Sequence, residues 1–133
     1  MKLKRLLYGS AIALAACSRA TSAPVETRVD RSVDLANGEA AHIENSAVVV
    51  RFGGANDSRC PSDVVCISAG EADITLLFSG AGADKVEVVH LMREPKGATY
   101  GGYRFDATAL APYPKSTAQG ADKTLTLRIT RAP

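Results

Sequence analysis

Aromatic residues are scarce in this chain of 133 residues, which has no Trp, 3 Phe and 4 Tyr. Although 46% of its residues are hydrophobic, much of that fraction is Ala, and we therefore expect a modest core of Val, Leu and Ile. The length corresponds to one domain, and no internal repeat or second domain is visible. A domain of about 100 residues buries roughly 60–68% of the surface that its unfolded chain exposes, which is enough to fold without a large margin.

Motifs that carry catalysis or cofactor binding are also missing. No G-x-S-x-G nucleophile elbow occurs, and the glycine pair at 53–54 lacks the Lys and Ser/Thr of a phosphate loop. His42 and His90 are the only histidines, and they show no metal-ligand spacing with each other or with Asp57 or Asp63. We therefore predict no enzyme activity, no cofactor and no metal site.

Neither sign of charge dominates. The chain has 16 Lys and Arg against 14 Asp and Glu, a net charge of +2. Lys2, Lys4 and Arg5 precede residue 17, and without these three the count is 13 against 14, a net charge of −1. Such a balance provides no electrostatic surface for nucleic acid, and we predict no nucleic-acid partner.

Long hydrophobic runs are absent, since none reaches the roughly 20 residues that a membrane-spanning helix requires. Residues 6–16 form a mostly apolar run of eleven residues behind a basic start, which is typical of a signal peptide. At the end of this run, Leu14-Ala15-Ala16-Cys17 resembles the bacterial lipobox, in which the Cys is acylated and becomes the first residue of the mature protein.

This resemblance implies a lipoprotein with a signal peptide over residues 1–16 and acyl chains such as palmitate on Cys17. Two or three chains would hold the protein on the bilayer, because each buried CH₂ adds about 0.8 kcal/mol. Residues 17–24 then form a lipidated tether, and 25–133 a β-rich exported domain. Ser18 is typical of lipoproteins sorted to the periplasmic face of the outer membrane in a Gram-negative cell. The alternative is an ordinary leader cut after Ala23, which would discard Cys17.

Apolar and polar residues alternate with period two in the rest of the chain, which indicates strands. The segments predicted as strands are 29–35, 72–78, 86–91, 103–107 and 124–130, together with 47–52, a β-branched run that could be buried on both faces. The first is followed by Asn37-Gly38, the dipeptide that best suits a tight hairpin turn, and no segment has a sustained helical period. We predict an all-β fold, a small antiparallel β-sandwich or barrel of about six to seven strands.

Cysteine is also rare, and only Cys60 and Cys66 remain if Cys17 is acylated. An exported chain meets an oxidising compartment, so we predict a disulfide between these two residues. Closing so short a loop stabilises a fold by about 2.4 kcal/mol in the chain-entropy treatment. Five residues separate the two thiols, which matches neither the CxxC redox spacing nor a zinc knuckle. A reactive thiol pair is the alternative.

The residues around these cysteines carry a second resemblance. A group of small bacterial lipoproteins and exported proteins shares the pattern D-S-R-C-P-x-x-V-x-C-x-x-x-G-E-A. This chain resembles that group at residues 57–61, Val64, Cys66 and 70–72. The similarity extends over most of residues 47–130 and departs at Ser68, where that group often has an aromatic residue. The resemblance implies the same fold and disulfide, and it carries over no particular activity.

The same loop and the tyrosines supply the remaining candidates for binding. We expect Asp57 and Ser58 to bond nearby backbone N–H groups and so shape the loop, and Arg59 to pair with a carboxylate. Tyr100, Tyr103 and Tyr113 are the aromatic residues expected to be exposed, although Tyr113, between two prolines, is better explained by packing within its loop.

Three functions are consistent with these features. The first is a non-catalytic β-domain, held at the bilayer through Cys17, that binds or assists another protein of the cell envelope. The second is an inhibitor of an extracytoplasmic hydrolase, which presents the loop 60–66 or the loop 112–114 as a rigid wedge. The third is a metal-dependent enzyme or metal carrier that uses His42 and His90.

Overall fold

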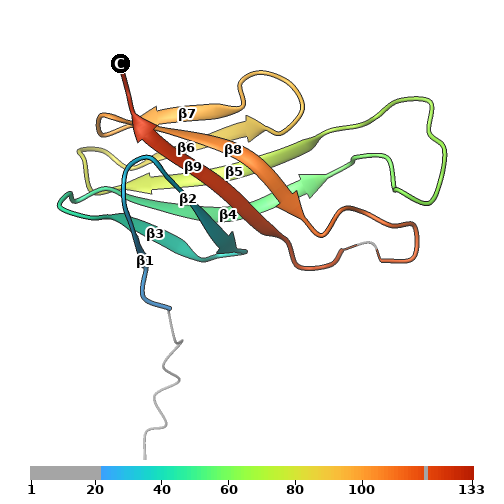
Figure 1. The fold of residues 1–133 in the computed structure, drawn as a ribbon, viewed down its shortest axis with the longest axis horizontal. Coiled ribbons are helices and arrows are strands. Elements are labelled where there is room, and N and C mark those ends of the chain that lie inside the picture. Colours follow the sequence, from blue (N-terminus) through green and yellow to red (C-terminus); the bar gives the residue numbers. More distant parts are fainter. Residues whose placement is uncertain (1–21, 119) are drawn as a thin grey trace, which may run out of the picture.

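The computed structural model describes residues 22–118 and 120–133, and this part of the chain folds into two β-sheets packed face to face (Figure 1). The strands of these residues are β1 (Val25–Thr27), β2 (Arg31–Ala36), β3 (Ala40–Ile43), β4 (Val49–Asp57), β5 (Ala72–Ser79), β6 (Lys85–His90), β7 (Gly97–Tyr100), β8 (Tyr103–Ala111) and β9 (Thr124–Arg131). No helix in the described residues could span a membrane. The predicted all-β sandwich is confirmed.

The two sheets are antiparallel except at one edge. One sheet has the strand order β1-β3-β4-β5-β6 and the other β2-β9-β8-β7, and only the β1–β3 pair is parallel among the described strands. The six segments predicted as strands correspond to β2, β4, β5, β6, β8 and β9. Alternation does not reveal β1, β3 and β7, because three or four residues are too few to establish a period.

The Asn37-Gly38 turn is present but does not form the predicted hairpin. Gly38 has φ +82°, and the Glu39 N–H donates a hydrogen bond of 2.9 Å to the Ala36 carbonyl. However, β2 pairs with β9 and β3 pairs with β4, so the turn leads from one sheet to the other. The hairpin prediction was wrong because the two strands cover one core from opposite sheets, which local turn chemistry does not reveal.

Three phenylalanines occupy the centre of the core between the sheets. Phe52, Phe78 and Phe105 are fully buried, and the centroid of the Phe78 ring lies 4.9 Å from that of Phe105 and 5.3 Å from that of Tyr100. Most other core side chains are the Val, Leu and Ile that the composition predicts. Burial of one large apolar side chain contributes roughly 1.5–3 kcal/mol.

Tyr100 belongs to this core, and the prediction that it is exposed was wrong. Its side chain has 8% exposure, and its hydroxyl accepts a hydrogen bond of 3.0 Å from the Ala81 N–H and donates one of 3.2 Å to the Ala83 carbonyl. Tyr103 is half-buried, with the Arg131 guanidinium 5.9 Å from its ring. Only Tyr113 of the three is exposed.

The connections between strands differ strongly between the two ends of the sandwich. The three longest, residues 58–71, 91–96 and 112–123, lie at one end, on the right in Figure 1. Short turns at 28–30, 80–84 and 101–102 close the other end. We call the first end the loop end. Loops carried by a rigid scaffold are frequent binding sites, so the loop end is the candidate position for a functional site.

Candidate functional site

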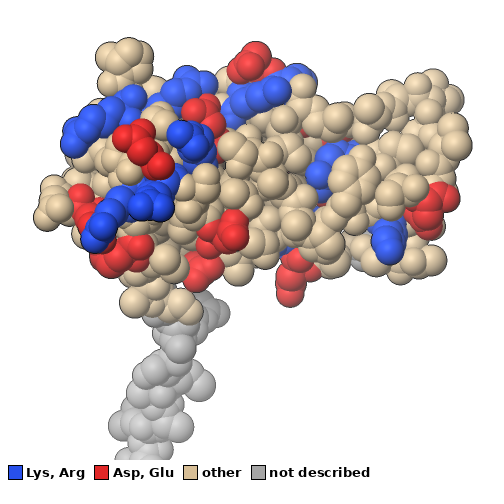
Figure 2. All heavy atoms as spheres, viewed as in Figure 1, with Lys and Arg blue, Asp and Glu red and all other residues tan. Residues whose placement is uncertain are grey.

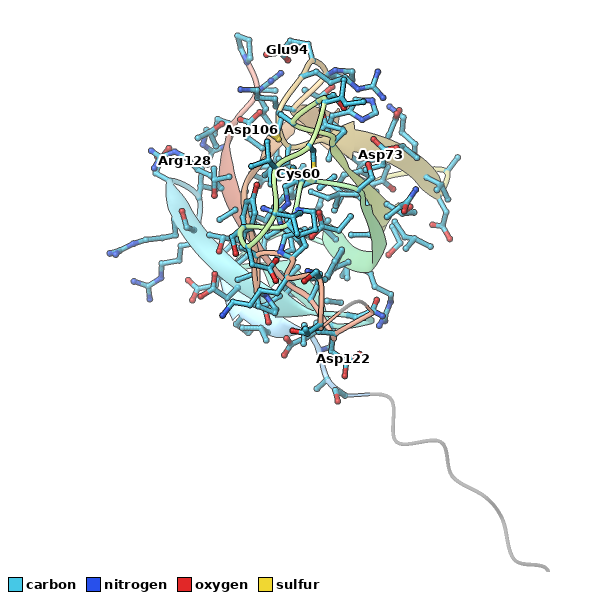
Figure 3. All side chains as sticks on the ribbon, turned by 90° about the vertical axis from the view of Figure 1, so that its right-hand side faces the viewer. Cys60, Asp73, Glu94, Asp106, Asp122 and Arg128 are labelled. Carbon is cyan, nitrogen blue, oxygen red and sulfur yellow. A yellow bond between two sulfur atoms is a disulfide. The ribbon has the colours of Figure 1, made fainter. Side chains whose placement is uncertain are left out.

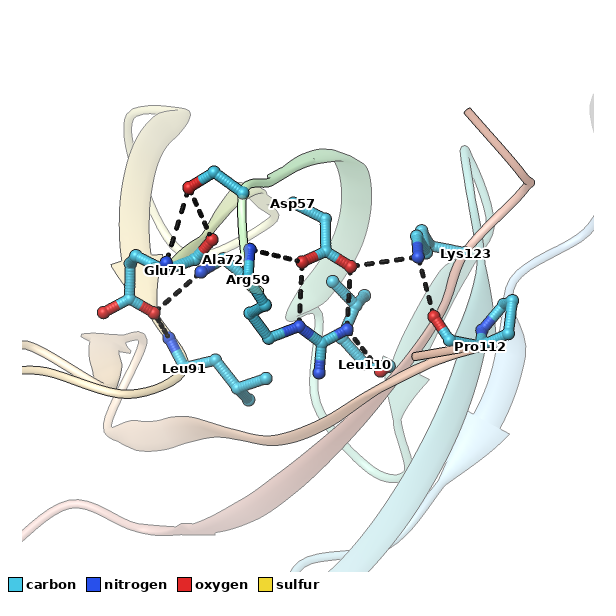
Figure 4. A network of polar contacts seen from close by, with 9 residues as sticks. Asp57, Arg59, Glu71, Ala72, Leu91, Leu110, Pro112 and Lys123 are labelled. Atoms are coloured by element: carbon cyan, nitrogen blue, oxygen red, sulfur yellow. Dashed lines mark hydrogen bonds and ion pairs between the residues drawn. The ribbon is translucent and has the colours of Figure 1, made fainter. Parts of the chain in front are cut away.

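A buried group of three charged side chains holds the base of the loop end (Figure 4). Asp57 ends β4, Arg59 begins the 58–71 connection, and Lys123 precedes β9. Their side chains have exposures of 6%, 5% and 13%. Asp57 accepts hydrogen bonds from Arg59 Nε and Nη2, at 2.8 and 2.7 Å, and its Oδ2 lies 2.9 Å from Lys123 Nζ. We call these three residues the charged triad.

The triad keeps Asp57 ionised. Burial alone would raise the pKa of this carboxyl, but the hydrogen bonds from Arg59 and Lys123 outweigh the burial and lower the pKa to about 2. The same bond raises the pKa of Arg59. Asp57 therefore acts as a fixed negative charge rather than as an acid or base near neutral pH. The expected pairing of Arg59 with a carboxylate is present, and Asp57 is that carboxylate.

Arg59 also connects three separate segments. Its Nη2 donates a hydrogen bond of 2.9 Å to the Leu110 carbonyl near the end of β8, and its guanidinium carbon lies 4.5 Å from the centroid of the Tyr113 ring. A guanidinium over an aromatic ring is attracted by the ring's π face. Tyr113 thus packs against its neighbouring loop, although half of its surface stays exposed.

Glu71 ties the 91–96 connection to the 58–71 connection. Its carboxylate accepts hydrogen bonds from the backbone N–H groups of Ala72 and Leu91, at 2.8 and 3.1 Å (Figure 4). It accepts a third, of 2.9 Å, from the Met92 N–H. Burial favours a higher pKa for Glu71, but these three donors prevail and lower it. Because Leu91 and Met92 begin the 91–96 connection, this single carboxylate fixes that connection beside the start of β5.

The predicted disulfide between Cys60 and Cys66 is present, with their Cα atoms 5.8 Å apart. We call residues 60–66 the stapled loop. The Ser62 N–H donates a hydrogen bond of 3.0 Å to the Pro114 carbonyl, and the Asp63 carboxylate accepts hydrogen bonds from the Ser116 N–H and hydroxyl. The disulfide closes the loop, and these contacts hold it against residues 112–123. Figure 3 looks onto this end of the molecule, with Cys60 labelled near the centre.

Apolar side chains in and next to the stapled loop are exposed to solvent, and we call this part of the loop end the tip. Val65 and Ile67 are fully exposed, and Val64 and Tyr113 are about half exposed. In Figure 2 the protruding upper right of the molecule carries no Lys, Arg, Asp or Glu, whereas charges of both signs crowd the opposite end. Exposed apolar groups on an ordered loop are typical of a surface that another molecule covers.

A cavity of about 580 Å³ lies behind the tip, between the end of β4 and the 112–123 connection. Asp57, Arg59 and Lys123 of the triad line it, together with Pro61 and Pro114. We call it the end cavity. The loop end therefore has a convex apolar tip and, next to it, a concave polar site.

The histidines lie elsewhere and apart from each other. His42 is on β3 and His90 on β6, with β4 and β5 between them. His42 Nδ1 lies 2.7 Å from Glu26 Oε1, which raises the pKa of His42, and His90 Nδ1 lies 2.6 Å from Asp73 Oδ1. In residues 22–118 and 120–133 no group of three His, Cys, Asp or Glu is placed to hold a metal ion. The arrangement that the metal hypothesis requires is not formed.

Two residues of the site could not be recognised from the sequence as members of it. Lys123 precedes a clear strand but carries no signal that it pairs with Asp57, and Glu71 belongs to the Gly-Glu-Ala part of the shared pattern without an assigned role. Cys17 and the signal peptide fall outside the described residues. No family model, curated protein or solved structure matches the chain.

Proposed function

We propose that this protein is a non-catalytic binding module of the bacterial cell envelope. It is exported, held on the bilayer by acyl chains on Cys17, and binds an envelope protein through its loop end. In a Gram-negative cell, Ser18 favours the periplasmic face of the outer membrane. The lipobox residues 14–17 support the anchor, and the loop end supports the binding role.

The observation that carries the binding role is that Val65, within the stapled loop, and Ile67, directly after it, are fully exposed. A disulfide closes this loop, and a hydrogen bond holds it to the 112–123 connection. A flexible loop pays an entropic cost when a partner orders it, and a preorganised loop avoids much of that cost. Exposed apolar side chains then supply the burial that stabilises the complex. The convex shape requires a partner with a concave apolar surface.

The test compares two pairs of exposed apolar residues. Val65→Ser with Ile67→Ser alters the tip, and Val86→Ser with Val88→Ser alters an equally spaced pair on β6 as the matched control. We expect a partner that is crosslinked in intact envelopes to be lost from the first variant and retained by the second. Equal recovery from both, or no reproducible partner of the unaltered protein, would overturn the proposal.

The anchor is tested separately by the intact mass of protein extracted from membranes. We expect acyl chains on Cys17 and the loss of two hydrogens at Cys60 and Cys66. A mature chain that starts beyond Ser18 and bears no acyl group would contradict the proposed address, while the role of the loop end would be judged by the crosslinking experiment alone.

A second candidate is an inhibitor of an extracytoplasmic hydrolase, which the convex, stapled loop favours. A rigid loop with apolar tips suits the concave active-site cleft of such an enzyme. The test is titration of the purified domain against lysozyme and common proteases. Inhibition that is lost on changing Val65 and Ile67 would support this candidate, and full activity of every enzyme would eliminate it.

A further inference from the structure

The end cavity is separate from the apolar tip and has its own chemistry. It lies at the mouth of the sandwich, between the end of β4 and residues 112–123, with a volume of about 580 Å³. Sites for small organic ligands commonly measure about 300–1,000 Å³ and combine apolar walls with a few fixed polar groups. Here the walls include Phe52, Ala55 and Ala121, and the polar groups belong to the charged triad and its neighbours.

The triad has an excess of positive charge. Arg59 and Asp57 neutralise each other through two parallel hydrogen bonds, the strongest common geometry for such a pair. The ammonium of Lys123 shares Asp57 Oδ2 and is therefore left without an anion of its own among the described residues. At 13% exposure of the Lys123 side chain, water screens this charge less than it screens a charge on the open surface.

Lys123 also keeps a donor for a ligand. An ammonium carries three N–H donors, and the described residues take two of them: Asp57 Oδ2 at 2.9 Å and the Pro112 carbonyl at 2.7 Å. Figure 4 shows these two acceptors holding the nitrogen between β4 and the 112–123 connection. An ammonium fixed in this way loses little freedom when it binds a further oxygen.

We propose that the end cavity binds a molecule with a single carboxylate and a short apolar body, with the carboxylate on Lys123 Nζ. Asn37 and Asn56 also line the cavity and add polar groups to its wall. Asp122 lines it too and disfavours a multiply charged anion such as phosphate. The carboxylate is that of a free small molecule or that of a peptide C-terminus. This inference does not rest on the proposed partner of the apolar tip.

The test titrates four probes into the full protein and follows the backbone amide NMR signals of residues 120–124. The probes are N-acetyl-alanine, an acetylated tri-alanine peptide acid, the same peptide as its C-terminal amide, and inorganic phosphate. We expect the acids to shift these signals at concentrations up to about 10 mM, and the amide and phosphate to leave them unchanged. Binding of both acids indicates a peptide end, and binding of N-acetyl-alanine alone indicates a small molecule.

The variant arm uses Lys123→Met, with Lys115→Met on the exposed part of the same connection as the control. We expect Lys123→Met to weaken acid binding at least about tenfold and Lys115→Met to leave it unchanged, because only Lys123 donates a charge-assisted hydrogen bond to the carboxylate. The comparison of acid with amide on the unaltered protein tests the proposal even if Lys123→Met does not fold. Equal shifts by acid and amide, stronger binding of phosphate, or no shift with any acid would overturn it.

Discussion

Asp57 is the residue that joins the two cations of the charged triad. The sequence places Asp57 and Arg59 together, and their residue types predict a loop-shaping acid and an arginine paired to a carboxylate. The structure shows that the two pair with each other and that Lys123 joins them. This third member could not be predicted, because Lys123 lies far along the chain and reaches Asp57 only through the packing of the sheet that holds β9 against the sheet that holds β4.

Replacing the carboxylate in Asp57→Asn leaves two buried cations without their anion, and we expect the free energy of unfolding at pH 7 to fall by about 2 kcal/mol. The folded-state pKa is about 2, below the ordinary value of 3.8, so this contribution is complete above about pH 4. It is lost as the pH falls toward 2. Urea unfolding at several pH values measures it.

Asp84→Asn is the matched control, since Asp84 is exposed in the turn between β5 and β6. We expect its effect to stay within about 0.5 kcal/mol at every pH. If Asp57→Asn has the same small effect, the charged triad does not stabilise the loop end.

At the scale of elements, the strands with clear alternation could be predicted and their partners could not. Residues 72–78 and 124–130 read as strands from their side chains alone, because one face of each is buried in the core. The Asn37-Gly38 turn misleads for a physical reason: its conformation suits a hairpin, but the choice between pairing and crossing to the other sheet depends on contacts distant in sequence.

In the turn after β5, Gly80 lies close to the backbone of Ala47. Gly80 and Gly82 have φ +97° and +98°, a conformation that side chains disfavour. A Cβ on Gly80 would collide with the carbonyl of Ala47, whereas one on Gly82 would meet open space. We expect Gly82→Ala to cost about 1 kcal/mol from its dihedral angle and Gly80→Ala about 1–3 kcal/mol more. Equal losses in thermal unfolding would show that the turn can move away from Ala47.

The disulfide of the stapled loop joins two residues that lie outside the strands. We expect Cys60→Ser with Cys66→Ser to lower the free energy of unfolding by about 2.4 kcal/mol and to leave the two sheets intact, because both cysteines lie outside the strands. Hydrogen exchange should speed up in residues 58–71 and stay slow in β5 and β9. Faster exchange throughout both sheets would mean that the disulfide supports the whole fold.

In the whole molecule, the loop end and the point where the chain enters the fold are on different sides. Residues 22–24 lead into β1 at an edge of its sheet, at the lower left in Figure 1, while the 58–71 and 112–123 connections project to the right. An anchor at Cys17 would therefore leave the loop end free to meet a partner. The fold class was predictable from alternation alone, but the gathering of the long connections at one end follows only from the strand order.

Photo-crosslinking in living cells tests directly whether the loop end binds an envelope protein. A photoreactive amino acid replaces Val65 at the tip or, as the control, Val86 on β6, both of which are exposed. We expect a crosslink from position 65 to one reproducible envelope protein and none to that protein from position 86. The same products from both positions, or none from position 65, would contradict it.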